Sequence, residues 1–242
     1  MFKNLNKDEM KTQYLFLLML LCSFSLSAQT VLLEIDTHEQ QKKVDFGPNM
    51  KKFSHLTFHF GALASKDRPG AKIIYGSSIN LSLGIRKKFR ISGIYSLGYD
   101  IDAQYTDYKF KQEKGKRFPD TIFNNVSQRL DYSSISLGFY NRFNFDPSRG
   151  NFLGTFLDIG INGAFDYAVK KISKKESENE IQSKSVLSHL PFVNKVNANA
   201  FARFGKGHFS FFSSYRLTKL FKPSYGYPDL PKLILGIDTA LF

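Results

Sequence analysis

Histidines are the first residues in this chain whose types and spacing could support chemistry. His55 and His59 share one face of a predicted strand, but four residues along a strand separate two side chains by roughly 13 Å, too far for one metal ion. Hydrogen-bonded structural histidines are therefore the favoured interpretation. His189 follows Ser188 and could act as a general base, although no neighbouring residue completes a triad. We expect no catalytic residue and no metal site.

Charged residues form a second pattern, because six of them fall on the polar side of runs in which apolar and polar residues alternate. These six are Asp100, Asp158, Lys195, Arg203, Arg216 and Asp238. If the runs are strands around a narrow interior, unpaired charges inside it would be costly. We therefore predict a lumen charge network whose members pair with one another, with Arg216 and Asp238 as the first pair expected.

Basic residues exceed acidic ones, at 34 to 21, and give a formal charge of +13. Many of them fall in two segments expected to be long loops: Lys109, Lys111, Lys114, Lys116 and Arg117 in one, and Lys170, Lys171, Lys174 and Lys175 in the other. They are not interleaved with stacking aromatic residues on one platform, as nucleic-acid binding would require, so no nucleic-acid partner is predicted. A solvated loop face and the binding of lipid phosphates both remain open.

Known enzyme motifs are missing from the sequence. There is no phosphate-binding loop, dinucleotide fingerprint, zinc-protease helix or nucleophile elbow. Cys22 is the only cysteine and lies in a segment expected to be removed, so no disulfide or thiol chemistry is predicted. The sequence favours a protein that is not an enzyme and uses no cofactor.

The elements that must position these residues are strands, because apolar and polar residues alternate with a period of two. Eight such runs are found, at 54–64, 76–87, 88–106, 128–144, 152–169, 190–205, 208–221 and 231–242. The connections between them alternate between long and short, the short ones including the corner Arg86-Lys87-Lys88 and the turn Gly205-Lys206-Gly207. This order is typical of an up-and-down barrel with long extracellular loops and short periplasmic turns. The sequence predicts an all-β, eight-stranded antiparallel transmembrane β-barrel.

A water-soluble sandwich or barrel is the alternative, since these folds also alternate. Their strands usually have about five or six residues, whereas ten or more alternate here with Phe, Leu, Ile and Tyr on one face and Gly, Ser, Asn, Asp and Arg on the other. Long runs of this kind favour a membrane strand. We predict residues 53–242 to be the barrel, in the outer membrane, with both termini in the periplasm.

The segment before the barrel has the order of an export signal. The apolar run from Tyr14 to Cys22 follows Lys11 and precedes the small residues Ser27 and Ala28, which is typical of a secretory signal peptide. We predict a signal peptide at 1–28 and a periplasmic lead-in at 29–52. Translation could begin at Met1 or Met10, a choice that remains open.

The chain ends on Phe242, and a terminal aromatic residue predicts recognition by the barrel-assembly machinery. This residue falls on the polar-face parity of the last run, which departs from the usual spacing. The signal end Ser27-Ala28-Gln29 and the C-terminal stretch carry a resemblance to small outer-membrane barrels of the Bacteroidota type, including the PorT-like group. The stretch contains Tyr215-Arg216-Leu217, Leu220-Phe221, Pro228-Asp229-Leu230-Pro231-Lys232-Leu233 and Gly236-Ile237.

That resemblance implies the fold and location, and less directly a role, since a few such proteins assist secretion or envelope assembly. We expect a non-enzymatic scaffold or accessory subunit that contacts outer-membrane lipid, lipid A phosphates and an envelope protein. One alternative is an enzyme that modifies lipid A through His189. A second alternative is a narrow pore, which would need an interior that the inward side chains leave open.

Overall fold

The computed structural model describes residues 47–64, 69–119, 126–148, 150–177 and 180–242, and the predicted signal peptide and most of the lead-in lie outside these ranges. Nine strands occur in the described residues. They are β1 (Lys52–Leu63), β2 (Ile79–Arg90), β3 (Tyr95–Phe110), β4 (Val126–Asn144), β5 (Thr155–Ser177), β6 (Glu180–Ser188), β7 (Val196–Lys206), β8 (Phe209–Arg216) and β9 (Leu233–Leu241). Two single turns of 3-10 helix, η1 (Tyr75–Ser77) and η2 (Pro223–Tyr225), lie in the connections.

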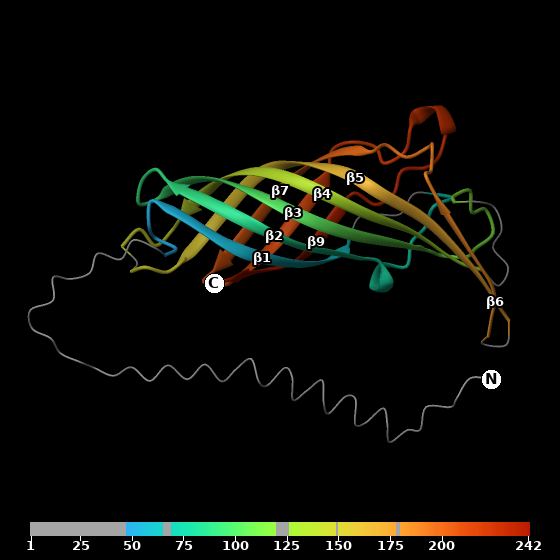
Figure 1. Ribbon diagram of the computed structural model, residues 1–242, viewed down its shortest axis with the longest axis horizontal. Coiled ribbons are helices and arrows are strands. Elements are labelled where there is room, and N and C mark those ends of the chain that lie inside the picture. The colour runs from blue at the N-terminus through green and yellow to red at the C-terminus, as the bar shows by residue number, and fades with distance from the viewer. Residues whose placement is uncertain (1–46, 65–68, 120–125, 149, 178–179) are drawn as a thin grey trace, which may run out of the picture. The chain divides into compact units, whose positions relative to one another are not determined.

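Eight of these strands close into a ring of antiparallel neighbours, β1-β2-β3-β4-β5-β7-β8-β9, and the ring is completed where β9 pairs with β1. At the closing seam, His59 lies opposite Asp238 and Gly61 opposite Gly236. Figure 1 shows the tilted strands of this barrel. Closure gives every ring strand two neighbours, so the ring itself has no open edge. The predicted eight-stranded antiparallel up-and-down barrel is confirmed.

The ninth strand, β6, was not expected from the sequence. It pairs with the last part of β5, from Lys170 to Ser177, after β5 has separated from β7. The ladder between β4 and β5 contains a bulge at the point of separation, where Tyr167 has no partner between Asp166 and Ala168. A bulge adds local twist and bend to a strand. The segment predicted as a long loop at Lys170 to His189 is therefore a hairpin, here called the arm, defined as residues 170–188.

A second correction concerns the connection between β2 and β3. The predicted corner at Arg86, Lys87 and Lys88 lies inside β2, which continues to Arg90, and the turn falls at 91–94. Arg86 and Lys88 are fully buried whereas Lys87 is partly exposed, so these residues continue the alternation of a strand. Three consecutive basic residues suggest a turn by composition alone, and only their partners inside the barrel reveal the strand.

The outer surface of the ring is apolar. Every ring strand places large apolar side chains outward that are more than 40% exposed, among them Phe58, Ile85, Ile101, Leu137, Ile161, Phe204, Phe211 and Ile237. The interior instead holds buried Arg, Asp, Asn and Ser side chains. This is the reverse of a water-soluble barrel. No helix within the described residues is long and apolar enough to cross a membrane.

The two ends of the barrel differ. The short connections lie at one end, together with residues 47–51 and Phe242; we call it the turn end. The ring of Phe242 stacks on His208 at 4.4 Å and meets Phe53 edge-on at 5.1 Å, while Lys88 donates a hydrogen bond to the carbonyl of Pro48. Phe53 is buried on β1, whereas His208 is exposed in the turn between β7 and β8, so Phe242 packs at the rim of the turn end.

The other end carries the long connections and is called the loop end. Here apolar side chains from the inner faces of β3 and β4 meet others from the connections. The cluster comprises Leu63, Ala71, Ile73, Tyr108, Phe110, Phe118, Leu130, Tyr132, Val193, Leu220, Phe221 and Leu230, and we call it the lid. Phe118 and Phe221 form its centre, with ring centroids 4.4 Å apart. The lid is the largest apolar core of the described residues, and it lies where the connections fold over the interior.

Candidate functional site in the lumen

The interior near the turn end is filled by a chain of six alternating charges. Its members are Arg142, Asp158, Arg203, Asp100, Arg86 and Asp238, from β4, β5, β7, β3, β2 and β9. Each strand places its charged residue on the inner face because side chains of one parity all point the same way. Three positive and three negative groups leave this cluster, here called the charge layer, with no net charge.

Contacts in the charge layer are short. Arg142 binds Asp158 through two parallel hydrogen bonds of 2.6 and 2.8 Å. Arg203 donates to Asp100 at 2.5 Å, and Arg86 donates to Asp238 at 2.9 Å. All of these side chains are at most 3% exposed. Charged groups so deeply buried are stabilised only when they are paired, so the layer acts as one unit.

Glycines make room for the charge layer. Gly138 on β4 lies opposite Asp100 in the ladder between β3 and β4. A Cβ added at Gly138 would lie only 2.0 Å from Asp100 Oδ1. Gly84 on β2 makes the same kind of room for Asp102, because a Cβ added at Gly84 would lie 2.1 Å from Asp102 Oδ1. These positions therefore require a residue without a side chain, because the carboxylates occupy the space that a Cβ would take.

Of the six predicted network members, four lie in the charge layer: Asp100, Asp158, Arg203 and Asp238. Arg216 is inward and buried but pairs with Asp229 at 3.0 Å, not with Asp238. Lys195 lies outside the lumen, since it precedes β7 and its side chain is exposed. The expected pair of Arg216 and Asp238 does not form. Asp238 instead binds Arg86, whose strand β2 lies two positions from β9 in the ring.

Two members of the charge layer, Arg86 and Arg142, were missed in the sequence. Arg86 falls on the polar parity of the run at 76–87 but also opens the predicted corner Arg86-Lys87-Lys88, and it was left out of the predicted network. Arg142 has the same parity as Ser136, Gly138 and Tyr140 on β4, so the alternation of this run could have predicted that Arg142 points inward. Two further inward carboxylates, Asp102 and Asp166, could have been found in the same way, since they follow the parity of Asp100 and Asp158.

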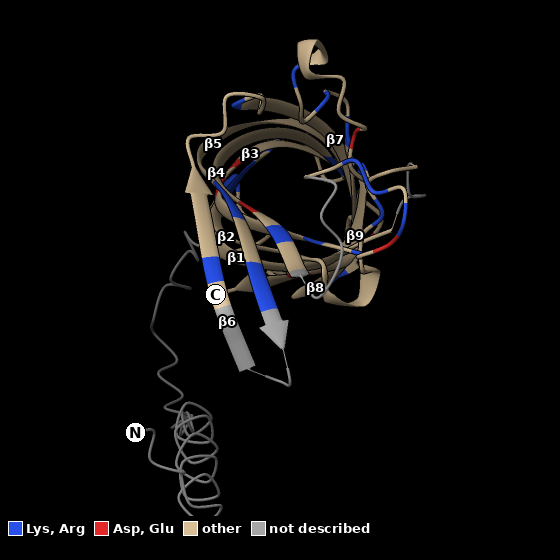
Figure 2. Cartoon of the chain, turned by 90° about the vertical axis from the view of Figure 1, so that its right-hand side faces the viewer, with Lys and Arg blue, Asp and Glu red and all other residues tan. Residues whose placement is uncertain are grey.

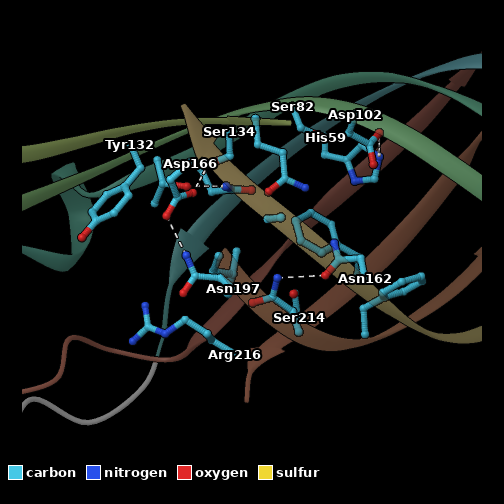
Figure 3. Close-up of a pocket in the computed structure, with 18 of the residues that line it drawn as sticks. His59, Ser82, Asp102, Tyr132, Ser134, Asn162, Asp166, Asn197, Ser214 and Arg216 are labelled. Atoms are coloured by element: carbon cyan, nitrogen blue, oxygen red, sulfur yellow. Dashed lines mark hydrogen bonds and ion pairs between the residues drawn. The ribbon is translucent and has the colours of Figure 1, made fainter. Parts of the chain in front are cut away.

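A polar cavity lies between the charge layer and the lid, with a volume of about 100 Å³. We call it the chamber. Asp100 and Arg203 of the charge layer contribute to its lining, as do Tyr108, Tyr132 and Leu220 of the lid. Figure 3 shows the side chains around it, among them His59, Asp102, Asn162, Asp166 and Asn197. The lumen is thus divided into three zones: charged, polar and apolar.

Hydrogen bonds between neighbouring strands hold the walls of the chamber. Asp166 accepts from Ser134 at 2.5 Å and from Asn197 at 2.6 Å. Asn199 donates to Asn162 at 2.8 Å (Figure 3). These bonds fix the side chains, and each amide still has capacity for further hydrogen bonds, since an Asn side chain offers two donor and two acceptor positions.

The predicted basic loops are divided between two kinds of structure. Lys109 lies on β3, and Lys170, Lys171, Lys174 and Lys175 lie on β5 where it forms the arm, so these five are strand residues. Lys111, Lys114 and Arg117 are exposed in the connection between β3 and β4. Lys116 in that connection is instead buried and donates hydrogen bonds to Gln112 and Gln128. Figure 2 shows basic residues along both strands of the arm.

The histidines take different positions. His59 faces the lumen, with Nε2 lying 3.5 Å from Asp238 and 3.8 Å from Asp102. His55 stacks on Phe53 at the turn end, with ring centroids 4.9 Å apart. His189 is exposed just after β6 and has a positive φ of 59°. Within the ranges that the structure describes, no group of three or more His, Cys, Asp or Glu residues could hold a metal ion.

The fold and the lumen together define an eight-stranded antiparallel β-barrel with a polar interior and an apolar exterior. Among solved structures, the chain is similar to Ail, the attachment invasion locus protein of Yersinia pestis. One Ail structure, in complex with the heparin analogue sucrose octasulfate, has a TM-score of 0.33 at 10% identity, with 78% of this chain and 94% of that chain covered. Another has a TM-score of 0.36 at 11% identity, covering 78% and 95%.

Sequence comparison adds no family, since the chain matches no protein-family profile and no curated protein. The likeness to Ail is too distant to bear on function. The resemblance to PorT-like barrels of the Bacteroidota stays a prediction. What the barrel does must therefore be argued from its own surfaces and interior.

Proposed function

We propose that this protein is an integral outer-membrane β-barrel that acts without catalysis, as a scaffold or accessory subunit in envelope assembly or secretion. The membrane location is supported by the outward apolar side chains, which occur on every ring strand. A closed barrel satisfies all backbone hydrogen bonds within the ring, as a hydrocarbon environment demands. The buried charges of the charge layer lie in the lumen, so the hydrocarbon of the bilayer does not contact them.

The proposal also includes an orientation. The turn end, with its short connections and Phe242, faces the periplasm, and the loop end faces outward. Short periplasmic turns and long outer loops are the usual arrangement in such barrels. The arm and the exposed cations Lys111, Lys114 and Arg117 then stand above the outer leaflet.

The observation that carries the scaffold role is the arm. Strand β6 pairs only with β5 among the strands described, so its other edge presents unpaired backbone groups. Ser183, Lys184, Ser185, Val186 and Leu187 are all exposed on it. An exposed edge of this kind can accept an extended segment of another protein as an additional strand. The eight-stranded ring closes without β6, so β6 is not needed to close the barrel.

The test is site-specific photo-crosslinking in living cells. A photoreactive residue at Ser183 or Ser185 is expected to capture one envelope protein reproducibly, and mass spectrometry of the crosslinked peptide would show an extended segment. A photoreactive residue at Phe211 on β8, which faces outward from the ring, is the matched control and should give only lipid adducts. Equal lipid labelling at both sites, with no protein product, would contradict the scaffold role.

A second experiment removes strand β6. Residues 180–188 are replaced with a Gly-Ser linker of the same length, which leaves β5 and its pairing with β4 in place. This variant should still insert and show heat-modifiable migration on a gel, while the crosslinked partner no longer co-purifies with it. Loss of insertion would show that the arm is needed for the barrel itself.

A further inference from the structure

Two carboxylates in the lining of the chamber have no positively charged partner. Asp102 on β3 and Asp166 on β5 both line it, and each is at most 4% exposed. Asp166 accepts hydrogen bonds from Ser134 and Asn197, which are both neutral. In the part of the chain that the structure describes, neither carboxylate forms an ion pair with a Lys or Arg side chain. A buried carboxylate without such a partner is costly, so these two groups would be stabilised by a positively charged guest.

Asp102 is the less satisfied of the two. Its Oδ1 atom lies beside Gly84 and is buried without a hydrogen-bond partner. Nε2 of His59 is 3.8 Å from this oxygen and 3.4 Å from Nη2 of Arg86. A guanidinium can only donate hydrogen bonds, so Nε2 accepts from Arg86 and has no proton to give to Asp102. His59 is therefore neutral and does not compensate the carboxylate.

The other charges around the chamber are paired among themselves. Arg203 binds Asp100 at 2.5 Å, while Asp229 binds both Arg216 and Lys232, at 3.0 and 3.5 Å. When Asp229 is counted with the lining, four carboxylates stand against three Lys or Arg side chains. The chamber thus carries one net negative charge, which a guest with a single positive charge would neutralise.

Two observations favour an organic ammonium group over a metal ion. The described residues contain no group of three or more His, Cys, Asp or Glu that could hold a metal. The chamber measures about 100 Å³, whereas a water-sized particle needs roughly 10–15 Å³ of comparable volume. Its walls also include the apolar side chains of Ala164, Phe212 and Ile234. Small-ligand sites commonly combine such apolar walls with a few polar groups that fix orientation, and a short alkyl chain would fit here.

Hydrogen-bond acceptors lie beside Asp102, and a primary ammonium group can donate three hydrogen bonds. Gln104, two residues further along β3, donates through Nε2 to Ser136 at 2.8 Å, so its Oε1 remains an acceptor. Ser82 lies opposite Gln104 in the ladder between β2 and β3, and both residues line the chamber. Figure 3 shows His59, Ser82 and Asp102 on one side of the chamber. This side therefore offers a carboxylate together with neutral acceptors.

We propose that the chamber binds a small molecule with one primary ammonium group, which donates hydrogen bonds to Asp102, Gln104 and Ser82. The alkyl part of this guest lies against Phe212 and Ile234. The proposal goes beyond the scaffold role and does not depend on it. The competing possibility is that water, with a proton on Asp102, satisfies the chamber without any guest, and the experiment must separate the two.

The experiment uses purified protein refolded in deuterated detergent in the presence of the probe, so that entry through the lid does not limit binding. The probe is n-propylamine, which is positively charged at neutral pH, and n-propanol and propionate are its neutral and negative counterparts. Saturation-transfer NMR should show saturable binding of the amine, at least about tenfold tighter than that of either counterpart, because only the amine matches the carboxylate. No saturable binding of the amine would mean water and a proton only. Equal binding of n-propanol would overturn the role of charge, and equal competition by ammonium chloride would overturn the organic ligand.

Variants tie the binding to Asp102. Asp102→Asn removes the charge and keeps the shape, so it should weaken binding of the amine by about tenfold or more. Asp107→Asn is the matched control, because Asp107 lies on the same strand at the opposite parity and outside the chamber. It should leave binding unchanged. Equal binding by the two variants would overturn the proposal.

A second measurement covers the case in which Asp102→Asn does not fold, as judged by heat-modifiable migration. Ala164→Leu then narrows the chamber without touching a charge and should also weaken binding. In the unaltered protein the amine should raise the urea concentration at which half of the folded gel band is lost, because a ligand that binds only the folded state stabilises it. The same amine should have no such effect on Ala164→Leu. An equal effect on both proteins would place the binding outside the chamber and overturn the proposal.

Discussion

Arg203 on β7 reaches Asp100 on β3 across the lumen, with Nη2 lying 2.5 Å from Oδ2. These strands are not neighbours in the ring, because β4 and β5 separate them on one side. The pair therefore crosses the interior and does not follow the wall. A cross-lumen ion pair at most 3% exposed blocks the path that a solute or ion would take.

The first prediction is that the barrel does not conduct. The charge layer fills the interior near the turn end with paired, buried side chains, so the reconstituted protein should show no steady current in a planar bilayer. Replacing Arg86 and Arg203 together with Ala should produce measurable openings, because two large side chains leave the lumen. Stable openings at every insertion of the unaltered protein would show that the layer is not a barrier.

A second prediction concerns the close approach of Gly138 and Asp100. Gly138→Ala places a Cβ where the Asp100 carboxylate lies and must displace the pair with Arg203, so it should destabilise the barrel by about 1–3 kcal/mol. Gly163→Ala is the matched control, because no atom lies within 4 Å of its added Cβ. The stability of both variants is measured from the urea concentration at which half of the protein has left the folded band on a gel. Similar midpoints for the two variants would refute the steric argument.

Orientation gives a third prediction. Added trypsin should cut intact cells at Lys111, Lys114 and Arg117, which are exposed at the loop end. It should not cut at Lys206, which is exposed at the turn end, until the outer membrane is permeabilised. Cleavage at Lys206 in intact cells, with the loop-end sites protected, would invert the proposed topology.

The loop-end cations make a fourth prediction about lipid. Each basic residue near an anionic surface contributes about 1 kcal/mol, an effect that salt weakens. Replacing Lys111, Lys114 and Arg117 with Gln should leave insertion intact and reduce the lipid A that co-purifies, more at low salt than at high. Lys116 is left unchanged because it is buried and bound to Gln128. Unchanged lipid at both salt levels would mean a merely solvated face.

A fifth prediction separates two roles of Phe242. Its ring contacts His208 and Phe53, so Phe242→Ala should lower the stability of barrel refolded in detergent, where no assembly machinery is present. Phe242→Leu should retain much of that stability. If Phe242 is also the assembly signal, both variants should accumulate poorly in cells. Normal accumulation of Phe242→Leu would leave packing as its only role.

The sequence predicted the ring well because one physical rule controls it. Strand residues alternate between the interior and the exterior, and Asp100, Asp158, Arg203 and Asp238 could be placed inside by that rule alone. The rule gives a side chain's face but not its partner. Arg216 and Asp238 share the inward face, yet their partners depend on height along the tilted strands, which only the register fixes.

Other features had no local signal. The arm was predicted as a loop because its alternation is masked by Lys and Glu, and because an exposed hairpin needs no apolar face. The lid was missed since Phe118 and Phe221 come from connections far apart in the chain. Lys116 resembled its exposed neighbours, and only its contact with Gln128 distinguishes it.

The bulge at Tyr167 marks the point where β5 exchanges one neighbour for another. Below it, β5 pairs with β4 and β7; above it, β5 keeps its ladder with β4 as far as Lys175 and pairs with β6 in place of β7. The two parts of one strand thus share one neighbour and differ in the other. Because β6 lies outside the closed ring, a change in the length of β6 would alter the reach of the arm and leave the number of strands around the barrel unchanged.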